Sequence, residues 1–251
     1  MRQIMDLVTL PGSQGEHRLQ QQYGTCERAD RFYAQQVENQ LNDRMREFVA
    51  RQEMMFVATA DANGECDCTF RAGPPGFVHV LDPSCLTWPE YRGNGVMASL
   101  GNMSENAQVG ILFVDFFRDR IGLHVNGAAV VVEDAYMRAH HADLPVDPVP
   151  GRRAERWVVV YVHEAYIHCA KHIPRVYRMP TNRAWGTDDV RRKGGDFFGV
   201  AAGRSDGQTA GNGHGSGDGL AAGNGHGSGD GLAAGNGHAA GNGHGNGHTP
   251  A

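Results

Sequence analysis

Between residues 54 and 162 the sequence consists of short apolar runs separated by turn-forming residues. The runs favour β-structure and are too short for core helices. Asp61-Ala62-Asn63-Gly64 is typical of a hairpin turn, in which Gly64 accepts a positive φ. Pro74 and Pro75 interrupt the pattern, because proline cannot donate to a strand ladder. We expect strands at 54–60, 65–72, 77–81, 86–88, 109–116, 121–132 and 157–162.

Helical periodicity is confined to two stretches. Apolar residues at steps of three and four between 28 and 52 predict an amphipathic helix, or two helices broken near Asn42. A shorter helix is expected at about 96–106. Because this is the one convincing helix between strands, the pattern excludes alternating βαβ units and favours an antiparallel barrel or sandwich. The predicted fold class is mainly β (α+β), with flanking helices.

The two ends of the chain differ from this central part. Residues 1–27 have no clear period and are expected to form an irregular lead-in. Residues 203–251 hold 18 of the 35 glycines, and one 11-residue sequence occurs at both 210–220 and 222–232. Glycine loses the most entropy on ordering, so we predict a disordered Gly/Asn/His-rich tail, whose histidines leave weak Zn²⁺ or Ni²⁺ binding open. The remaining residues, 28–202, are expected to form one domain with a single core.

Charge and cysteine content exclude several functional classes. The formal net charge is −5, which argues against a general nucleic-acid binder. The five cysteines are odd in number and irregularly spaced, so no disulfide framework is expected. We therefore expect a cytoplasmic location, where thiols stay reduced. No apolar run approaches the ~20 residues of a membrane span, and the N-terminus lacks the apolar core of a signal peptide. We expect no membrane partner.

The stretch that most favours ligand binding is the loop 91–95, Tyr-Arg-Gly-Asn-Gly, with the helix that follows. Loop N–H groups and the partial positive charge of a helix N-terminus attract anions. Arg92 adds a planar fork suited to phosphate, and Asn94 adds an amide. Ser99 and Asn102 follow one to two turns later. The same residue types also serve turns for their shape alone, so the loop permits a purely structural interpretation as well.

A second arginine is expected near this loop. Arg71 ends a predicted strand, and Thr69 points to the same face because side chains alternate along a strand. Arg71 and Arg92 together would suit the charge of about −2 on a phosphate monoester. The alternative is that they are two separate solvated surface arginines.

Four motifs follow one another along the chain: FRAGPPGF, YRGNG before a helix, VGILFVDF and HVNGAAVVV. Through these motifs, residues 50–175 resemble the pyridoxamine 5'-phosphate oxidase family. The resemblance implies a split β-barrel that binds flavin mononucleotide (FMN) in a groove between the subunits of a homodimer. It places Arg71, Arg92 and Asn94 at the phosphate and ribityl chain. The full set of cofactor-binding residues that we predict is Thr69, Arg71, Tyr91, Arg92, Gly93, Asn94, Ser99, Asn102 and Lys171.

The chain also departs from this family. The founding oxidase has Ser-Arg-Lys-Gly where this chain has Tyr-Arg-Gly-Asn-Gly, so the phosphate lysine is missing. The C-terminal substrate-binding Arg/His pattern is not evident either. We therefore expect a related flavin-dependent oxidoreductase rather than a true pyridoxamine phosphate oxidase, acting on a small-molecule substrate or with a nicotinamide electron donor. The alternative is a non-catalytic protein that binds flavin, deazaflavin or haem on the same barrel, and deazaflavin is also possible as the enzyme's cofactor.

The segment 166–175 leaves three interpretations open. Lys171 or Arg175 would contact the flavin ring oxygens, as the resemblance implies. His168, Cys169 and His172 would be metal ligands, although no second ligand cluster accompanies them, and we assign no metal. The third interpretation is a purely structural role. No Ser–His–Asp or paired-carboxylate site is evident, so no catalytic residue is assigned, and flavin chemistry does not require one.

Overall fold

Two long antiparallel strands, β7 (Ile121–Glu133) and β8 (Arg156–His168), form the centre of the fold. The computed structural model describes residues 10–147, 150–179, 189, 191–192 and 194–201. The chain divides into two units, Met1–Gly195 and Asp196–Ala251, and the fold described here belongs to the first. The predicted tail 203–251 lies outside the described residues.

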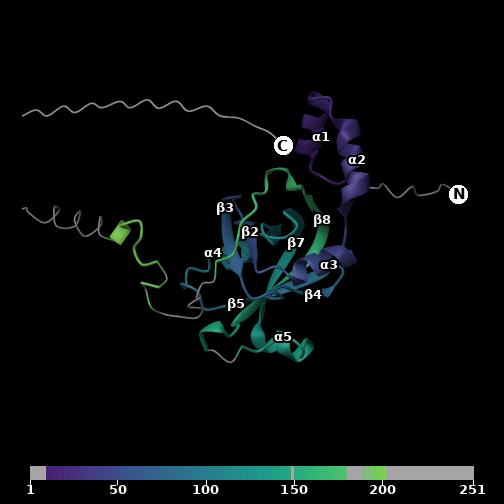
Figure 1. Cartoon of the computed structure of the whole chain (residues 1–251). Coiled ribbons are helices and arrows are strands. Elements are labelled where there is room, and N and C mark those ends of the chain that lie inside the picture. Colours follow the sequence, from purple (N-terminus) through teal and green to yellow (C-terminus); the bar gives the residue numbers. More distant parts are fainter. Residues whose placement is uncertain (1–9, 148–149, 180–188, 190, 193, 202–251) are drawn as a thin grey trace, which may run out of the picture. The chain divides into compact units, whose positions relative to one another are not determined.

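The sheet is antiparallel throughout, with strand order β3-β2-β6-β7-β8-β5-β4, and β1 pairs with β8 beside this path. Figure 1 shows the strands and the helices around them. The other strands are β1 (Val37–Glu38), β2 (Met54–Ala60), β3 (Cys66–Ala72), β4 (His79–Asp82), β5 (Cys85–Glu90) and β6 (Gln108–Asp115). The helices are α1 (Gln14–Gln22), α2 (Cys26–Gln36), α3 (Asp43–Ala50), α4 (Ala98–Glu105) and α5 (Asp134–His140), with 3₁₀ turns η1 (Pro150–Arg152) and η2 (Ala170–His172).

The predicted fold class is confirmed: the sheet is open rather than a closed barrel, as in a split barrel. The β6 strand pairs with the first part of β7, whereas β5 pairs with the first part of β8. The register of β7 against β8 shifts between Asn126 and Gly127. Such an irregularity increases the local bend and twist of a strand pair.

The core lies between the two parts of the sheet. Alternate residues of β2, β6 and β7 point into it, as expected for strands with one buried face. Phe48 and Val49 of α3 and Met103 of α4 complete this cluster. Each large apolar side chain buried in this way contributes about 1.5–3 kcal/mol relative to exposure. A smaller cluster, containing Met137 and Trp157, forms where α5 packs against β8.

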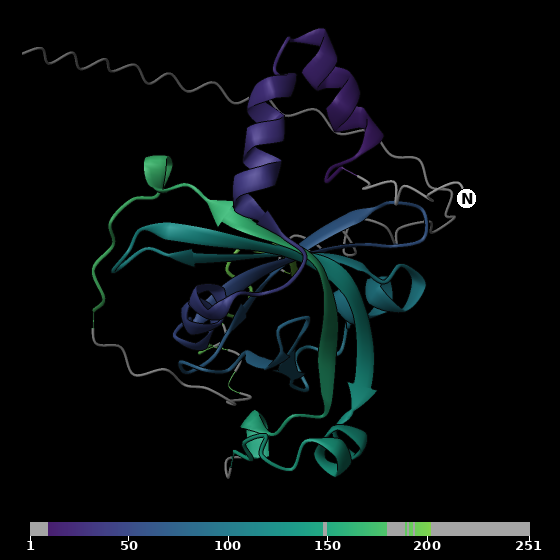
Figure 2. The same ribbon diagram turned by 90° about the vertical axis from the view of Figure 1, so that its right-hand side faces the viewer.

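The helices differ from the sequence prediction at the N-terminal end. Of the two alternatives for 28–52, the structure has two helices, α2 and α3, and Asn42 caps α3 by accepting from the N–H of Met45 at 3.0 Å. Helix α1 lies inside the segment predicted to be irregular, and Ser13 caps it. Because α1 contains no buried residue, core packing left no clear apolar period in its sequence. In Figure 2 both helices project from the sheet, opposite α5.

No helix in the described ranges is both long and apolar enough to cross a membrane.

Gly127 is expected to be essential to the bend in β7. A Cβ atom at this position would collide with the backbone carbonyl oxygen of Tyr161 on β8, and neither backbone can yield easily. We expect Gly127→Ala to lower the free energy of unfolding by roughly 1–3 kcal/mol. Gly101→Ala in α4 is the matched control: it has open space around it and should raise stability by about 0.5–1 kcal/mol. Urea titrations followed by tryptophan fluorescence would contradict this account if both variants unfolded alike.

Candidate functional site

A polar groove of about 430 Å³ lies between β3, the end of β5 and the loop that leads into α4. Seven of the nine residues predicted to bind a cofactor line it: Thr69, Arg71, Tyr91, Arg92, Gly93, Asn94 and Ser99. These residues come from two segments separated by the β4–β5 hairpin. The structure therefore brings together the two arginines that the sequence placed near one another.

Arg71 is held in place by a buried network. Its Nε donates to Oε1 of Glu90 at 2.7 Å, and its Nη1 donates to Oγ1 of Thr69 at 2.7 Å. The same Glu90 oxygen accepts from Nε1 of Trp88 at 2.8 Å. Glu90 is 8% exposed and Trp88 is 1% exposed. Because β3 and β5 lie far apart in the strand order, this ion pair links the two parts of the curled sheet.

The loop into α4 has an unusual backbone. Gly93 and Gly95 have φ values of 59° and 81°, and Met97 reaches φ 57° although it carries a side chain. Left-handed non-glycine residues are uncommon and concentrate at functional sites. Asn94 supports the turn by accepting from the N–H of Val96 at 3.0 Å.

The first turn of α4 faces the groove without a side-chain cap. Met97 is the N-cap residue and makes no capping hydrogen bond through its side chain. Ala98, Ser99 and Leu100 all line the groove. The N–H groups at the start of a helix favour an anion, so this turn adds to the positive character of the arginines.

Two carboxylates offset that positive character. Asp67 and Glu90 line the groove together with Arg71 and Arg92, so the formal charges balance. Ser99, which is buried, donates its hydroxyl to Oδ2 of Asp67 at 3.4 Å. The donor set still fits a phosphate group, because the two guanidinium groups, the Ser99 hydroxyl and the start of α4 converge on one groove. Its attraction for a dianion is weaker than two unopposed arginines would give.

The structure does not bring the other two predicted residues into the groove. Asn102 instead donates its Nδ2 to Oγ1 of Thr59 at 3.0 Å, which fixes α4 to β2. Lys171 is an exposed residue of η2, which follows β8.

The histidines of the 166–175 segment do not form a ligand cluster. His168 lies on β8 and its Nδ1 is 3.0 Å from Nε2 of His124 on β7. Cys169 and His172 are exposed. Among the described residues there is no group of three or more His, Cys, Asp or Glu side chains placed to hold a metal ion.

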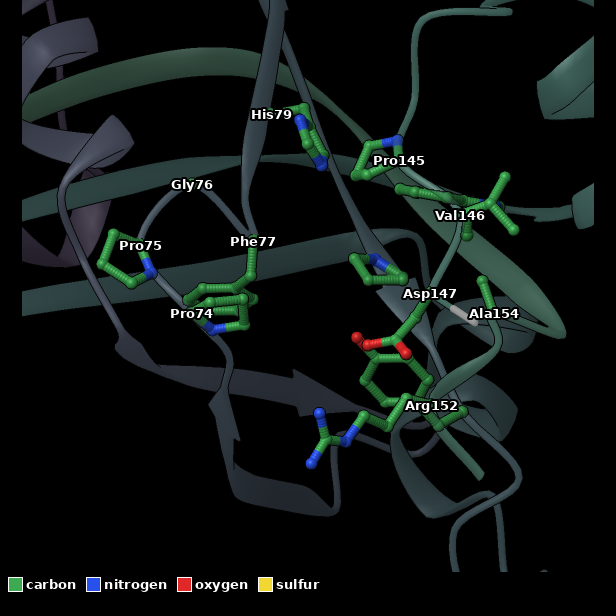
Figure 3. Close-up of a pocket in the computed structure, with 13 residues that line it drawn as sticks. Pro74, Pro75, Gly76, Phe77, His79, Pro145, Val146, Asp147, Arg152 and Ala154 are labelled. Carbon is green, nitrogen blue, oxygen red and sulfur yellow. The ribbon is translucent and has the colours of Figure 1, made fainter. Parts of the chain in front are cut away.

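A second cavity of about 600 Å³ adjoins the groove (Figure 3). Tyr91 is a lining residue of both. The rest of the lining comes from the 74–77 loop, from β4 and β5, from the chain between α5 and β8, and from Trp157 of β8. Burial raises the pKa of Tyr91, and the negative charges of Asp147 and Glu90 raise it further, while Arg152 lowers it. The Tyr91 phenol is therefore uncharged at neutral pH and remains a hydrogen-bond donor.

No sequence pattern indicated this second cavity. Phe77, His79, Arg152 and Trp157 form no motif, because their spacing along the chain is irregular. The two prolines at 74 and 75 were recognised as a strand break, which places them in a loop but does not reveal that this loop forms a cavity wall.

Glu90 is expected to limit anion binding in the groove. Glu90→Gln keeps an acceptor for Trp88 and removes the charge that neutralises Arg71. We expect inorganic phosphate to bind at least tenfold more tightly, since one unit charge even about 10 Å away is worth on the order of 1–2 kcal/mol at an effective dielectric constant of about 20. Arg71→Met should weaken phosphate binding and also destabilise the fold by about 3 kcal/mol, because it leaves a buried carboxylate without its partner.

Calorimetric titration at low ionic strength measures both effects. Glu133→Gln is the matched control, because Glu133 pairs with Nε of Arg156 at 3.2 Å and is not part of the groove lining. Equal phosphate affinities for Glu90→Gln and the unaltered protein would show that Arg71 does not face the bound anion.

Comparison with solved structures returns chains that cover about half of this one. HupZ of Group A Streptococcus is 19% identical with a TM-score of 0.39, covering 55% of this chain and 99% of its own. HutZ, a haem storage protein of Vibrio cholerae, is 15% identical with a TM-score of 0.35, covering 51% of this chain and 94% of its own. An F420 reductase is 18% identical with a TM-score of 0.34, covering 49% of this chain and 94% of its own. No curated protein matches the sequence significantly.

The family model described as pyridoxamine 5'-phosphate oxidase matches residues 41–169. This range contains β2 to β8 and all of the groove residues. The match spans more than half of the chain and coincides with the antiparallel sheet described above, which confirms the resemblance drawn from the sequence motifs. The chain belongs to the pyridoxamine 5'-phosphate oxidase family.

Proposed function

We propose that the protein binds FMN with its phosphate in the polar groove and acts as a flavin-dependent oxidoreductase. The observation that carries the proposal is the convergence of Arg71, Arg92 and Ser99 with the uncapped first turn of α4. Family membership supports a flavin as the ligand. A bound flavin supplies the ability to accept or donate a hydride, so the chain itself has only to bind, orient and shield it.

Each side chain of the groove has a distinct part in this proposal. Arg71, fixed by Glu90 and Thr69, presents a preorganised guanidinium group, so little entropy is lost when an anion binds. Asn94 stabilises the turn of the loop by accepting from the N–H of Val96. Lys171 and Asn102 do not line the groove. In this proposal they contact the cofactor only if it extends beyond the groove or is bound across a subunit interface.

The chain is not proposed to be a true pyridoxamine phosphate oxidase. The loop 91–95 lacks the phosphate lysine of that enzyme, and Glu90 neutralises one of the two arginines that remain. Weaker attraction for phosphate is the physical consequence. A flavin held by fewer charges needs additional contacts along its ribityl chain and ring, and a second subunit is a natural source of them.

The purified protein is expected to carry FMN or to bind it when added. The visible absorbance spectrum and the mass of the released chromophore test this directly, and they separate FMN from a deazaflavin and from haem. Reduction of bound flavin by NADH or NADPH, followed by reoxidation with an acceptor, distinguishes an enzyme from a non-catalytic carrier. A chain ending at residue 202 should bind FMN equally well if the folded domain is 28–202. A colourless protein that does not bind added FMN would sink the proposal.

We also propose that the protein is a homodimer that buries the outer face of the sheet. Phe70, Phe56, Leu112, His124 and Tyr166 are successive cross-strand partners on that face, running from β3 to β8. Phe70 and Phe56 are 52% and 37% exposed, and their ring centroids are 5.5 Å apart. Adjacent exposed aromatic side chains on a sheet are typical of protein–protein contacts.

Phe70→Lys is expected to convert the dimer to a monomer, because it would place a charge in the buried contact. Its effect on the stability of the monomer should stay within about 0.5 kcal/mol, since Phe70 is an exposed side chain on a terminal strand of the sheet. Tyr136→Lys is the matched control, because Tyr136 is a 59% exposed aromatic residue on α5. Light scattering after size-exclusion chromatography gives the mass of each, and a monomeric unaltered protein would refute the dimer.

A further inference from the structure

Two histidine side chains meet on the outer face of the sheet, the face that we propose the homodimer buries. Nε2 of His124 on β7 lies 3.0 Å from Nδ1 of His168, the last residue of β8. The two are diagonal neighbours, because His168 is the cross-strand partner of Gly122, two residues before His124. A Cβ atom at Gly122 would lie 2.8 Å from Cβ of His168, so the glycine leaves room for the second histidine.

The side chains around this pair are aromatic or apolar. The ring of Tyr166 on β8 stacks on that of His124, with the centroids 4.7 Å apart and the planes at 18°. Phe32 of α2 meets Tyr166 edge-on, with the centroids 6.0 Å apart. On the other side, the cross-strand partner of His124 on β6 is Leu112. The pair is therefore flanked within the row of aromatic and apolar residues proposed for the dimer contact.

The charged neighbours come from β8, α1 and α2. Glu164 of β8 acts on His124 itself. Glu16 of α1 and Arg28 of α2 line a cavity together with Glu164 and Tyr166, so their charges act from the side of the helices. Because Glu16 and Arg28 have opposite charges, they offset one another, and Glu164 is left as the charge that favours a protonated His124.

The uncharged form of His124 is nevertheless favoured at neutral pH. Burial lowers its pKa, a positive charge on His168 lowers it further, and Glu164 offsets only part of these effects. The contact between the two rings limits protonation as well. One facing nitrogen must donate and the other accept, so the pair keeps its hydrogen bond with one added proton, whereas a second proton makes both nitrogens donors.

A second subunit on this face would remove the pair from water. Taking an imidazolium charge out of water costs free energy, so the contact weakens proton binding, and by linkage protons weaken the contact. We propose that the His124–His168 pair makes the homodimer pH-dependent, holding the subunits together while the pair is uncharged and releasing them when acid protonates it. This inference rests on the proposed homodimer and does not depend on the flavin.

The pH range follows from the ordinary pKa of histidine, about 6.5. Because the contact lowers the pKa of the pair, the dimer has its full stability above this value and loses it as the pH falls below it. A histidine that binds its proton tenfold more weakly in the dimer weakens the dimer about tenfold once it is protonated in the monomer. Since a dimer contains two pairs, we expect the dissociation constant to rise roughly tenfold or more between about pH 7.5 and about pH 5.5.

Sedimentation velocity of the full-length protein, diluted in steps at both pH values, measures this dissociation constant. The double variant His124→Gln with His168→Gln keeps polar side chains at both positions but cannot titrate, so its dimer should be equally stable at both pH values. His140→Gln is the matched control, because His140 is an exposed histidine at the end of α5, and it should keep the full pH dependence.

A second measurement stays decisive if the double variant does not fold. Hydrogen–deuterium exchange at the C2 carbon of histidine rings, read by mass spectrometry, gives the pKa of His124 in the unaltered dimer and in the Phe70→Lys monomer. By linkage, this pKa should be lower in the dimer than in the monomer.

The outcomes separate this inference from the homodimer itself. Equal dissociation constants at both pH values overturn the inference, and so does a pH dependence that persists in the double variant or a His124 pKa that is the same in dimer and monomer. A dimer that is equally stable at about pH 5.5 refutes only the pH dependence. A protein that is monomeric at about pH 7.5 refutes the homodimer and, with it, this inference.

Discussion

The pairing of β7 with β8 is the constraint on which the rest of the structure depends. Both strands are 13 residues long, and each carries a different part of the sheet: β6, β2 and β3 extend from β7, and β5 and β4 extend from β8. The register shift at Gly127 bends the pair. Glycine is required there, because the backbone carbonyl oxygen of Tyr161 on β8 lies where a Cβ atom would stand. This curvature brings β3 opposite the end of β5 and makes the Arg71–Glu90 ion pair possible.

That ion pair connects the fold to the site. Glu90 is buried beside Trp88, so its charge needs the partner that Arg71 provides. The ion pair also holds the Arg71 side chain at the groove in a fixed direction, although the negative charge of Glu90 partly neutralises it. The same residue links the two parts of the curled sheet and is one that we propose to bind the anion, and these two roles would oppose one another. Beside its arginines, the groove has the uncapped start of α4 and a loop in which Met97 has a positive φ.

Local sequence patterns predicted the strands and the groove loop well. Hairpin turns such as Asp61–Gly64 and apolar runs such as 109–116 depend on neighbouring residues only, so their structure can be inferred from the sequence. Arg71 ends a predicted strand and Arg92 lies in the loop before a predicted helix, which is why both are expected near one groove. Helix α5 was missed, because it has only 7 residues and a single buried one, Met137, leaving almost no period to detect. The second half of β8, residues 163–168, was missed as well, because most of its residues are only partly buried or exposed and mix polar with apolar side chains.

The sequence by itself determined an antiparallel, mainly β architecture, the family, and a groove in which seven of the nine predicted residues meet. These follow from the side-chain period, turn chemistry and motif order, which are properties of short segments. Only the tertiary structure decided that Glu90 neutralises Arg71, that Lys171 and Asn102 lie outside the groove lining, and that a second cavity shares Tyr91 with it. The reason is physical: these features are contacts between segments tens of residues apart, and the curvature of the β7–β8 pair, rather than any local preference, sets which segments meet.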